Sequence, residues 1–214
     1  MFRSILRFLT GKRGFHSSRY WEDRYRAKGN SGAGSYGVFA EYKAEVINQF
    51  VAEYGIRSVI ELGCGDGNQA SKLNVGKYLG VDVSKTVIAR CKDIFRGDAT
   101  RRFVHLPNLK DQSADLTMSL DVIYHLIENE VFHSHMELLF ERAEQYVMIY
   151  STNVDQDQGL GQHVRHRKFS EWVEANASDF ESCKIIENSI DRSHFAKGDL
   201  PASFYIYRRV SKAN

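Results

Sequence analysis

Residues 59–67 read Val-Ile-Glu-Leu-Gly-Cys-Gly-Asp-Gly, a short apolar run that leads into three glycines at alternate positions. Gly63, Gly65 and Gly67 have no Cβ, so the backbone there can adopt positive φ and approach a ligand closely. We predict a strand over residues 58–62, directly before the glycines, and a helix that begins near Asn68. Strand, glycine turn and helix in this order are typical of nucleotide sites in doubly wound α/β folds.

The spacing of the glycines distinguishes two cofactors. A dinucleotide fingerprint needs G-x-G-x-x-G, but here the third glycine comes one position early and Asn68 stands where the fingerprint needs glycine. Glu61 lies two residues before the first glycine. The pattern E-x-G-x-G-x-G resembles motif I of class I S-adenosylmethionine-dependent methyltransferases. The alternative is a plain glycine-rich turn.

A second apolar run follows at residues 78–82 and ends in Asp82, 17 residues after Gly65. A ribose-binding acid is expected near this distance, at the end of the second strand. A carboxylate accepts hydrogen bonds from two hydroxyls more strongly than a neutral side chain does. The resemblance places an acid and a small residue after the third strand, beside the adenine, and Asp98 and Ala99 match that place.

Residues 114–122 read as a fourth strand and continue as Ile-Tyr-His-Leu. This looks like the D-V-x-x-H-L segment of small-substrate methyltransferases. Near the N-terminus, residues 20–25 resemble the Y-W-x-x-R-Y segment that forms a lid over the cofactor in many such enzymes. The resemblance covers roughly residues 18–210. It implies cofactor-binding roles for Tyr20, Arg24, Glu61, Gly63, Gly65, Gly67, Asp82, Asp98, Ala99 and Asp121, with S-adenosyl-L-methionine as the cofactor.

Two predicted cofactor contacts concern the methionine part. Asp121 at the end of the fourth strand could bind its ammonium group, or cap the following helix. Arg24, four residues after Tyr20 and on the same predicted helical face, could pair with the cofactor carboxylate. Residues 31–37, rich in glycine and serine, are predicted to form a mobile flap.

The candidate catalytic residues are His125, His163 and Arg165. His125 follows Asp121 by four residues, and histidine titrates in the range that suits a general base; alternatively it holds the loop by a backbone hydrogen bond. His163 and Arg165 belong to the run His-Val-Arg-His-Arg at residues 163–167. In extended backbone alternate residues share one side, where arginine forks could bind a carboxylate or phosphate. A solvated basic turn is the alternative.

Composition excludes several classes of protein. Apolar residues make up 43% and charged residues 26%, an ordinary globular balance. The three cysteines are widely spaced without a C-x-x-C pair, so we expect neither a disulfide framework nor a metal site. Residues 1–28 hold eight Lys/Arg and two acids, whereas the remainder holds 21 basic and 25 acidic residues. An acidic body argues against a nucleic-acid partner.

Residues 1–14 begin with an amphipathic pattern in which Phe2, Ile5, Leu6 and Leu9 share one helical face. The run is too short to cross a bilayer. Three interpretations stay open: a helix packed on the domain, weak contact with an anionic membrane surface, or an organelle-targeting segment. We expect a cytoplasmic protein, with membrane association only through this end.

The chain therefore divides into a basic N-terminal segment, 1–17, and one methyltransferase domain, 18–214. Strands alternating with helices and two late strands predict a single α/β domain with a mostly parallel sheet. The resemblance implies a Rossmann-like fold of seven strands, the last antiparallel, with helices on both faces. We expect strands near residues 146–150, 184–187 and 203–208, and helices over residues 39–54, 128–145 and 169–175.

The sequence favours an S-adenosylmethionine-dependent methyltransferase that methylates an oxygen, a hydroxyl or a phosphate, on a small or saccharide-linked acceptor. The N-P-P-Y-type loop of enzymes that methylate adenine or glutamine nitrogens is replaced by Ser-Leu-Asp-Val at residues 119–122. The alternatives are a nicotinamide-dependent oxidoreductase on a similar fold and a non-catalytic protein that keeps the cofactor pocket. The sequence does not determine the oligomeric state.

Overall fold

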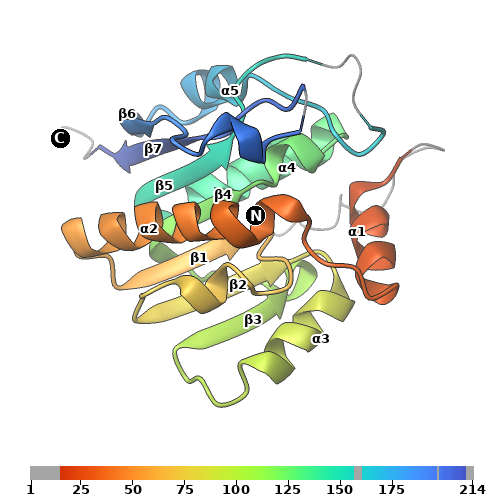
Figure 1. Cartoon of the computed structure of the whole chain (residues 1–214). Coiled ribbons are helices and arrows are strands. Elements are labelled where there is room, and N and C mark those ends of the chain that lie inside the picture. Colours follow the sequence, from red (N-terminus) through yellow and green to blue (C-terminus); the bar gives the residue numbers. More distant parts are fainter. Residues whose placement is uncertain (1–14, 157–160, 197, 211–214) are drawn as a thin grey trace.

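The computed structural model describes residues 15–156, 161–196 and 198–210. In this part of the chain seven strands form one sheet in the order β3-β2-β1-β4-β5-β7-β6 (Figure 1). The first five strands are mutually parallel, and β7 runs antiparallel between β5 and β6. The predicted fold class is thereby confirmed. The strands are β1 (Ser58–Leu62), β2 (Lys77–Asp82), β3 (Arg101–His105), β4 (Ala114–Leu120), β5 (Ala143–Ser151), β6 (Phe180–Ile186) and β7 (Ser203–Arg209).

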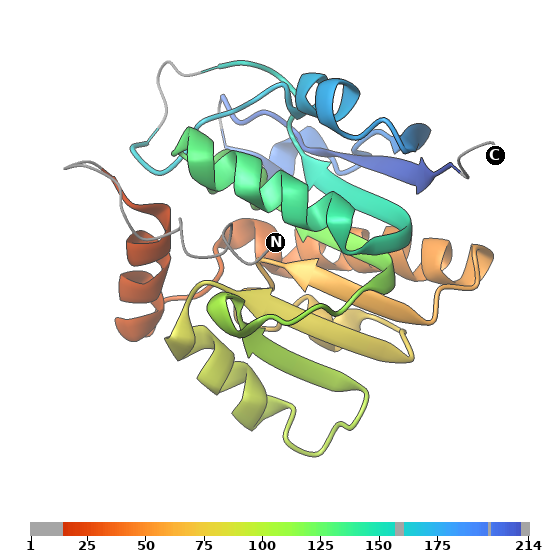
Figure 2. The same cartoon turned by 180° about the vertical axis from the view of Figure 1, so that it is seen from behind.

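Helices cover both faces of the sheet because successive strand residues point to opposite sides. Val59 of β1 packs in one apolar cluster with α2 (Gly37–Glu53) and α3 (Lys85–Ile94). Its neighbour Ile60 packs in the other cluster, with α4 (Asn129–Glu141) and α5 (Phe169–Asn176). Figure 2 shows α4 and α5 on the face seen from behind.

The short helix α1 (Ser17–Arg26) lies beside the edge of the sheet at which the parallel strands end (Figure 1). The predicted N-terminal segment falls almost wholly outside the described residues, and so does its proposed membrane contact. Among the helices that the structure describes, none combines the length and the hydropathy needed to cross a bilayer.

Two predicted elements are wrong. The segment between β1 and β2, all of it described, contains only the short 3-10 helix η3 (Ala70–Lys72) in place of the helix expected from Asn68. The third strand is β3, which begins at Arg101 and therefore follows residues 95–99. A helical crossover between parallel strands usually needs a dozen or more residues. The chain has too few between the glycine turn and β2 for a helix and its connections, so the crossover is compact.

Candidate active site

A cleft lies at the carboxyl ends of β1, β2 and β4, the position at which open α/β sheets bind ligands. It encloses about 1100 Å³, open solvent at its mouth included, a size suited to a cofactor. Predicted residues that line it are Glu61, Gly63, Gly65, Asp82, Asp121 and His125. Further lining residues include Trp21, Tyr25, Ser31, Lys43, Asp66, Gln69, Leu106 and His135.

The three glycines all have positive φ: +86° at Gly63, +55° at Gly65 and +81° at Gly67. The space left by their missing Cβ atoms is filled mainly by other parts of the protein. A Cβ on Gly63 would lie 2.5 Å from the Val122 side chain, and one on Gly67 would lie 2.8 Å from Phe95. Gly67, predicted to bind cofactor, does not line the cleft. It permits the close packing of the turn on the end of α3.

The flap, residues 31–37, is fixed on the glycine turn. The Ser31 amide donates to Asp66 Oδ2 at 2.9 Å, and the Asp66 amide donates to Ser31 Oγ at 2.9 Å. Tyr36 adds a hydrogen bond to the same carboxylate oxygen at 2.7 Å. The structure therefore binds residues 31–37 to the glycine turn through Asp66, and their mobility stays a prediction.

Two buried carboxylates form the floor of the cleft. Asp82 accepts hydrogen bonds from the Gly65 and Ser84 amides, at 3.0 and 2.9 Å. Burial nevertheless raises its pKa to about 6. Glu61 accepts a hydrogen bond from Tyr78, and burial raises its pKa to about 7. Both groups thus change charge near neutral pH, as polar groups of binding sites often do.

Asp121 stands at the other side of the cleft with φ +58°, a conformation that non-glycine residues rarely adopt. Its Oδ1 accepts a hydrogen bond from the Tyr124 hydroxyl at 2.7 Å. Its Oδ2 forms an ion pair with the ammonium group of Lys43 on α2. Lys43 is only 1% exposed, and its Nζ lies 5.3 Å from the centre of the Tyr150 ring.

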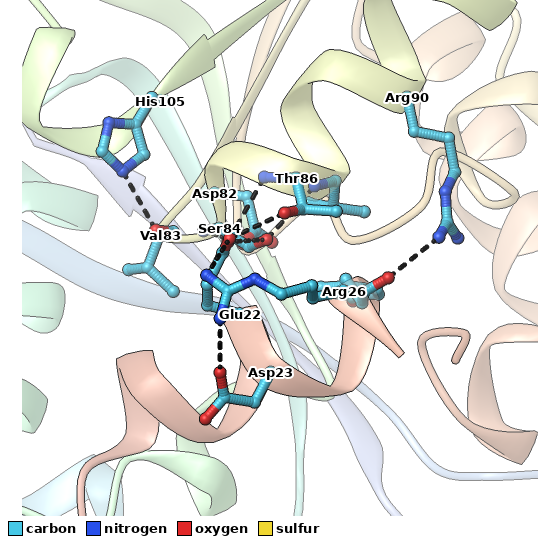
Figure 3. A network of polar contacts seen from close by, with 11 residues as sticks. Glu22, Asp23, Arg26, Asp82, Val83, Ser84, Thr86, Arg90 and His105 are labelled. Atoms are coloured by element: carbon cyan, nitrogen blue, oxygen red, sulfur yellow. Dashed lines mark hydrogen bonds and ion pairs between the residues drawn. The ribbon is translucent and has the colours of Figure 1, made fainter. Parts of the chain in front are cut away.

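The lid helix α1 is attached to the start of α3. Figure 3 shows Glu22 of α1 beside Ser84 and Thr86. Glu22 accepts hydrogen bonds from the Ser84 hydroxyl at 2.6 Å and from the Thr86 hydroxyl at 2.7 Å. Burial alone would raise the pKa of Glu22, but these hydrogen bonds outweigh it and lower the pKa to about 2. Arg90 of α3 adds a hydrogen bond to the Tyr25 carbonyl at 3.2 Å.

Three rings connect the lid to the predicted catalytic residues. Tyr20 stacks on His163 with ring centres 4.9 Å apart, and His163 stacks on His125 at 5.6 Å. His125 Nδ1 lies 2.8 Å from the His163 carbonyl oxygen. A carbonyl can only accept, so Nδ1 carries the proton and Nε2 keeps its lone pair. Of these three residues only His125 lines the cleft.

The arginines of the basic run form hydrogen bonds with the loop before α4 and with the first residue of that helix. Arg165 donates to Asn129 Oδ1 at 2.9 Å, and Arg167 donates to the Ile127 carbonyl at 2.8 Å. Neither lines the cleft. Arg24, predicted to pair with the cofactor carboxylate, also lies outside the lining and donates to the Asn30 carbonyl at 2.6 Å. All three arginine side chains thus form hydrogen bonds with other parts of the fold.

Comparison with known proteins identifies the family. Residues 60–138 match the family described as "Methyltransferase domain", and this match runs from the middle of β1 through the glycine turn to β4 and most of α4. Together with the fold, this match over residues 60–138 supports a class I S-adenosylmethionine-dependent methyltransferase. The predicted family, enzyme class and cofactor are thereby confirmed. No curated protein matches the sequence.

Solved structures agree with this methyltransferase fold. Magnesium protoporphyrin IX methyltransferase (ChlM) from Synechocystis PCC 6803 with bound SAM has a TM-score of 0.65 at 13% identity, over 94% of this chain and 100% of that one. N-methyltransferase NodS from Bradyrhizobium japonicum WM9 in complex with S-adenosyl-L-homocysteine gives 0.66 at 10%, over 91% and 99%. The [4+2]-cyclase SpnF gives 0.68 at 12%, over 91% and 95%. The fold is therefore shared by proteins of different activity.

One pair of predicted cofactor contacts is misplaced in the methyltransferase domain. Asp98 and Ala99 precede β3, so they lie at the edge of the sheet opposite the cleft. The Asp98 side chain closes a turn instead, with the Thr100 amide at 2.9 Å. Hydrogen bonds from Thr100 lower the pKa of Asp98. The residue that follows β3 and lines the cleft is Leu106.

The methyltransferase cleft fits its cofactor in chemical character. A buried carboxylate, Asp82, ends β2, and a partly buried one, Asp121, follows β4, on either side of the glycine turn. Apolar side chains, among them Leu106 and Leu126, line another part of the wall. A ligand with hydroxyls, a cationic group and a flat apolar base matches this distribution.

Sequence analysis missed several lining residues of the methyltransferase cleft. Lys43 had a signal: it lies four residues after Phe39 and four before Ile47, on the apolar face of the predicted helix. Asp66 lies between Gly65 and Gly67, at a position that the motif E-x-G-x-G-x-G leaves unspecified. For His135, one of two histidines in α4, the sequence offers no such signal.

Proposed function

We propose that this methyltransferase domain methylates an oxygen, a hydroxyl or a phosphate, of a small or saccharide-linked acceptor. His125 is the observation that carries the proposal. Its ring lines the cleft, and its Nδ1 proton is engaged by the His163 carbonyl. The unprotonated Nε2 is therefore the lone pair that can accept a proton from an acceptor hydroxyl.

The protonation of His125 suits this role at neutral pH. Burial lowers its pKa to about 4, so the imidazole is neutral and its lone pair is present at pH 7. When bound, S-adenosylmethionine supplies an electrophilic methyl group. Asp82 and the glycine turn would hold its ribose side and Asp121 its methionine side. An acceptor phosphate needs no base, and His125 would then only position it.

The lid and flap favour a small acceptor or the end group of a larger one. Trp21 of the lid and Ser31 of the flap both line the cleft, so both segments contribute to its wall, which suits a small acceptor group. The N-methyltransferase NodS shares the fold, which makes nitrogen the competing acceptor atom.

The test has two stages. Calorimetry with S-adenosylhomocysteine and NAD should show binding of the first alone. Methyl transfer from labelled S-adenosylmethionine is then screened against sugars, sugar phosphates, small alcohols and amines, with His125→Gln as the matched variant. We expect an oxygen-methylated product and, for a hydroxyl acceptor, a loss in turnover of about a hundredfold in the variant. A product methylated only on nitrogen would refute the proposal.

A further inference from the structure

The charges that line the cleft are unbalanced. Glu61, Asp66, Asp82 and Asp121 contribute four carboxyl groups. Among the described lining residues, Lys43 is the one lysine, and arginine is absent. The side chain of Lys43 is 2% exposed, and that of Asp121 is 15% exposed. A single ammonium group is thus held at one side of an acidic cleft.

Stability of the fold does not explain this pair well. Taking two charges out of water costs several kcal/mol per ion, and buried pairs are often replaceable by apolar residues without loss. Asp121 also carries the strain of a positive φ, and strain of this kind is concentrated at functional sites. The Tyr124 hydroxyl fixes the orientation of its carboxylate. These features indicate a binding element.

The pair and Asp82 stand at opposite sides of the glycine turn. Asp82 ends β2, Asp121 follows β4, and β1 lies between these two strands. Two strand spacings separate their ends by about 10 Å. A cofactor whose ribose lies at Asp82 would therefore extend its other end toward Asp121 and Lys43. In S-adenosylmethionine that end is an α-amino acid group, an ammonium and a carboxylate on one carbon.

We propose that Lys43 and Asp121 together form the receptor for this amino acid group, with Lys43 bound to its carboxylate and Asp121 to its ammonium. This inference rests on the proposed function. In the protein without ligand the two side chains neutralise each other. With ligand, each exchanges part of that contact for the opposite charge of the amino acid group. Lys43 thereby takes the role that the sequence pattern assigned to Arg24.

The experiment compares three probes by calorimetry: S-adenosylhomocysteine, its decarboxylated analogue and 5′-methylthioadenosine, which lacks the whole amino acid group. Lys43→Gln keeps a hydrogen-bond donor for Asp121 while removing the charge. We expect it to weaken S-adenosylhomocysteine binding by about tenfold to a hundredfold and to leave the other two dissociation constants within twofold. Lys72→Gln, which removes a charge paired with exposed Glu41, is the control and should change none.

Asp121→Asn gives the complementary result, because it should weaken both probes that carry the ammonium group and spare 5′-methylthioadenosine. Binding of that truncated probe also shows that the cleft of each variant is folded. Equal losses for all three probes in Lys43→Gln would assign Lys43 a structural role and overturn the inference. Unchanged S-adenosylhomocysteine binding would overturn it as well. A wild-type protein that binds none of the probes would instead refute the proposed function.

Discussion

Ser31 occupies the space into which a side chain on Gly65 would project. A Cβ built on Gly65 overlaps Ser31 Oγ and lies 3.1 Å from the Tyr25 hydroxyl. The central glycine of the motif therefore makes room for the flap. This differs from the simplest view of such glycines, in which only the ligand needs the space.

Gly65→Ala should consequently displace the flap as well as strain the backbone. A left-handed conformation costs an alanine about 1–2 kcal/mol, and displacement of Ser31 breaks its hydrogen bonds with Asp66. We expect a loss of at least about 1 kcal/mol in unfolding free energy and weaker binding of S-adenosylhomocysteine. Chemical denaturation and calorimetry measure the two effects. Gly97→Ala, at a position with nothing within 4 Å of its Cβ, is the matched control.

A double-mutant cycle locates the cause. If Ser31 is the obstacle, the effects of Gly65→Ala and Ser31→Gly should be less than additive, since the second removes the side chain that the first displaces. Strict additivity would show that the new methyl group obstructs the ligand alone.

Binding of S-adenosylhomocysteine should weaken in acid because of Asp82. Only the ionised carboxylate can accept hydrogen bonds from both ribose hydroxyls, and its pKa is about 6. Affinity should be constant above pH 7 and fall toward tenfold per pH unit below about 6. Calorimetry from pH 5 to 8 measures this. Asp82→Asn should bind weakly at every pH, and Glu61→Gln separates any contribution of the second carboxyl group.

The stability of the ligand-free protein depends on pH in the opposite direction from ligand binding. The pKa of Asp82 is raised from 3.8 to about 6, so the fold favours the protonated group. Its contribution to stability is full below 3.8 and is lost as the pH rises through about 6. If Asp82→Asn leaves the pH dependence of denaturation unchanged, the assignment of this titration is wrong.

Glu22→Gln should loosen the lid. The variant replaces a charged acceptor of bonds from Ser84 and Thr86 by a neutral one, which we expect to cost about 1–2 kcal/mol and to accelerate ligand dissociation. Because its pKa is lowered from 4.5 to about 2, the contribution of Glu22 is full above pH 4.5 and is lost as the pH falls toward 2.

Stopped-flow measurement of S-adenosylhomocysteine release tests the lid directly. Asp23→Asn is the control: it lies on the same helix, but its carboxylate bonds exposed Arg26, also of α1, at 3.1 Å (Figure 3). A dissociation rate that is equally raised in both variants would indicate that the helix, and not the contact with α3, sets the rate.

Adenine recognition should depend on Leu106 and not on Asp98. Leu106→Ala removes apolar surface from the cleft wall, so we expect about tenfold weaker binding of S-adenosylhomocysteine. Asp98→Asn acts at the opposite edge of the sheet and should leave the affinity within twofold while slightly lowering the melting temperature. Calorimetry and thermal denaturation give both values. Weaker binding in Asp98→Asn would contradict the placement of β3.

Local pattern predicted most of the fold. The strands beside the glycine turn are short apolar runs that end in glycine or an acid, and β1 matches its predicted bounds at both ends. The missing helix after the turn could not be read from residue type, because the limit is the length of the connection. The third strand, Arg-Arg-Phe-Val-His, is too polar to be distinguished by its pattern. Asp98 is therefore predicted to follow this strand, whereas it precedes it.

The cleft was predicted in part for a different reason. Glu61 and Asp82 lie at the ends of β1 and β2, and Asp121 follows β4. The carboxyl ends of parallel strands meet at one edge of the sheet whatever the rest of the chain does. Lys43 depends on a partner 78 residues away. His163 and Arg165 lie in a basic run whose members the structure separates, one against the lid and the other against the loop before α4. Tertiary contacts of this kind have no local signature.

The stack of Tyr20, His163 and His125 connects α1 with the candidate base, so the same helix lies near the predicted sites of both the methyl donor and the acceptor. Trp21 of α1 lines the cleft, and its neighbour Tyr20 stacks on the histidine that backs the candidate base. We therefore expect an ordered addition, in which the donor binds first and the demethylated product leaves last.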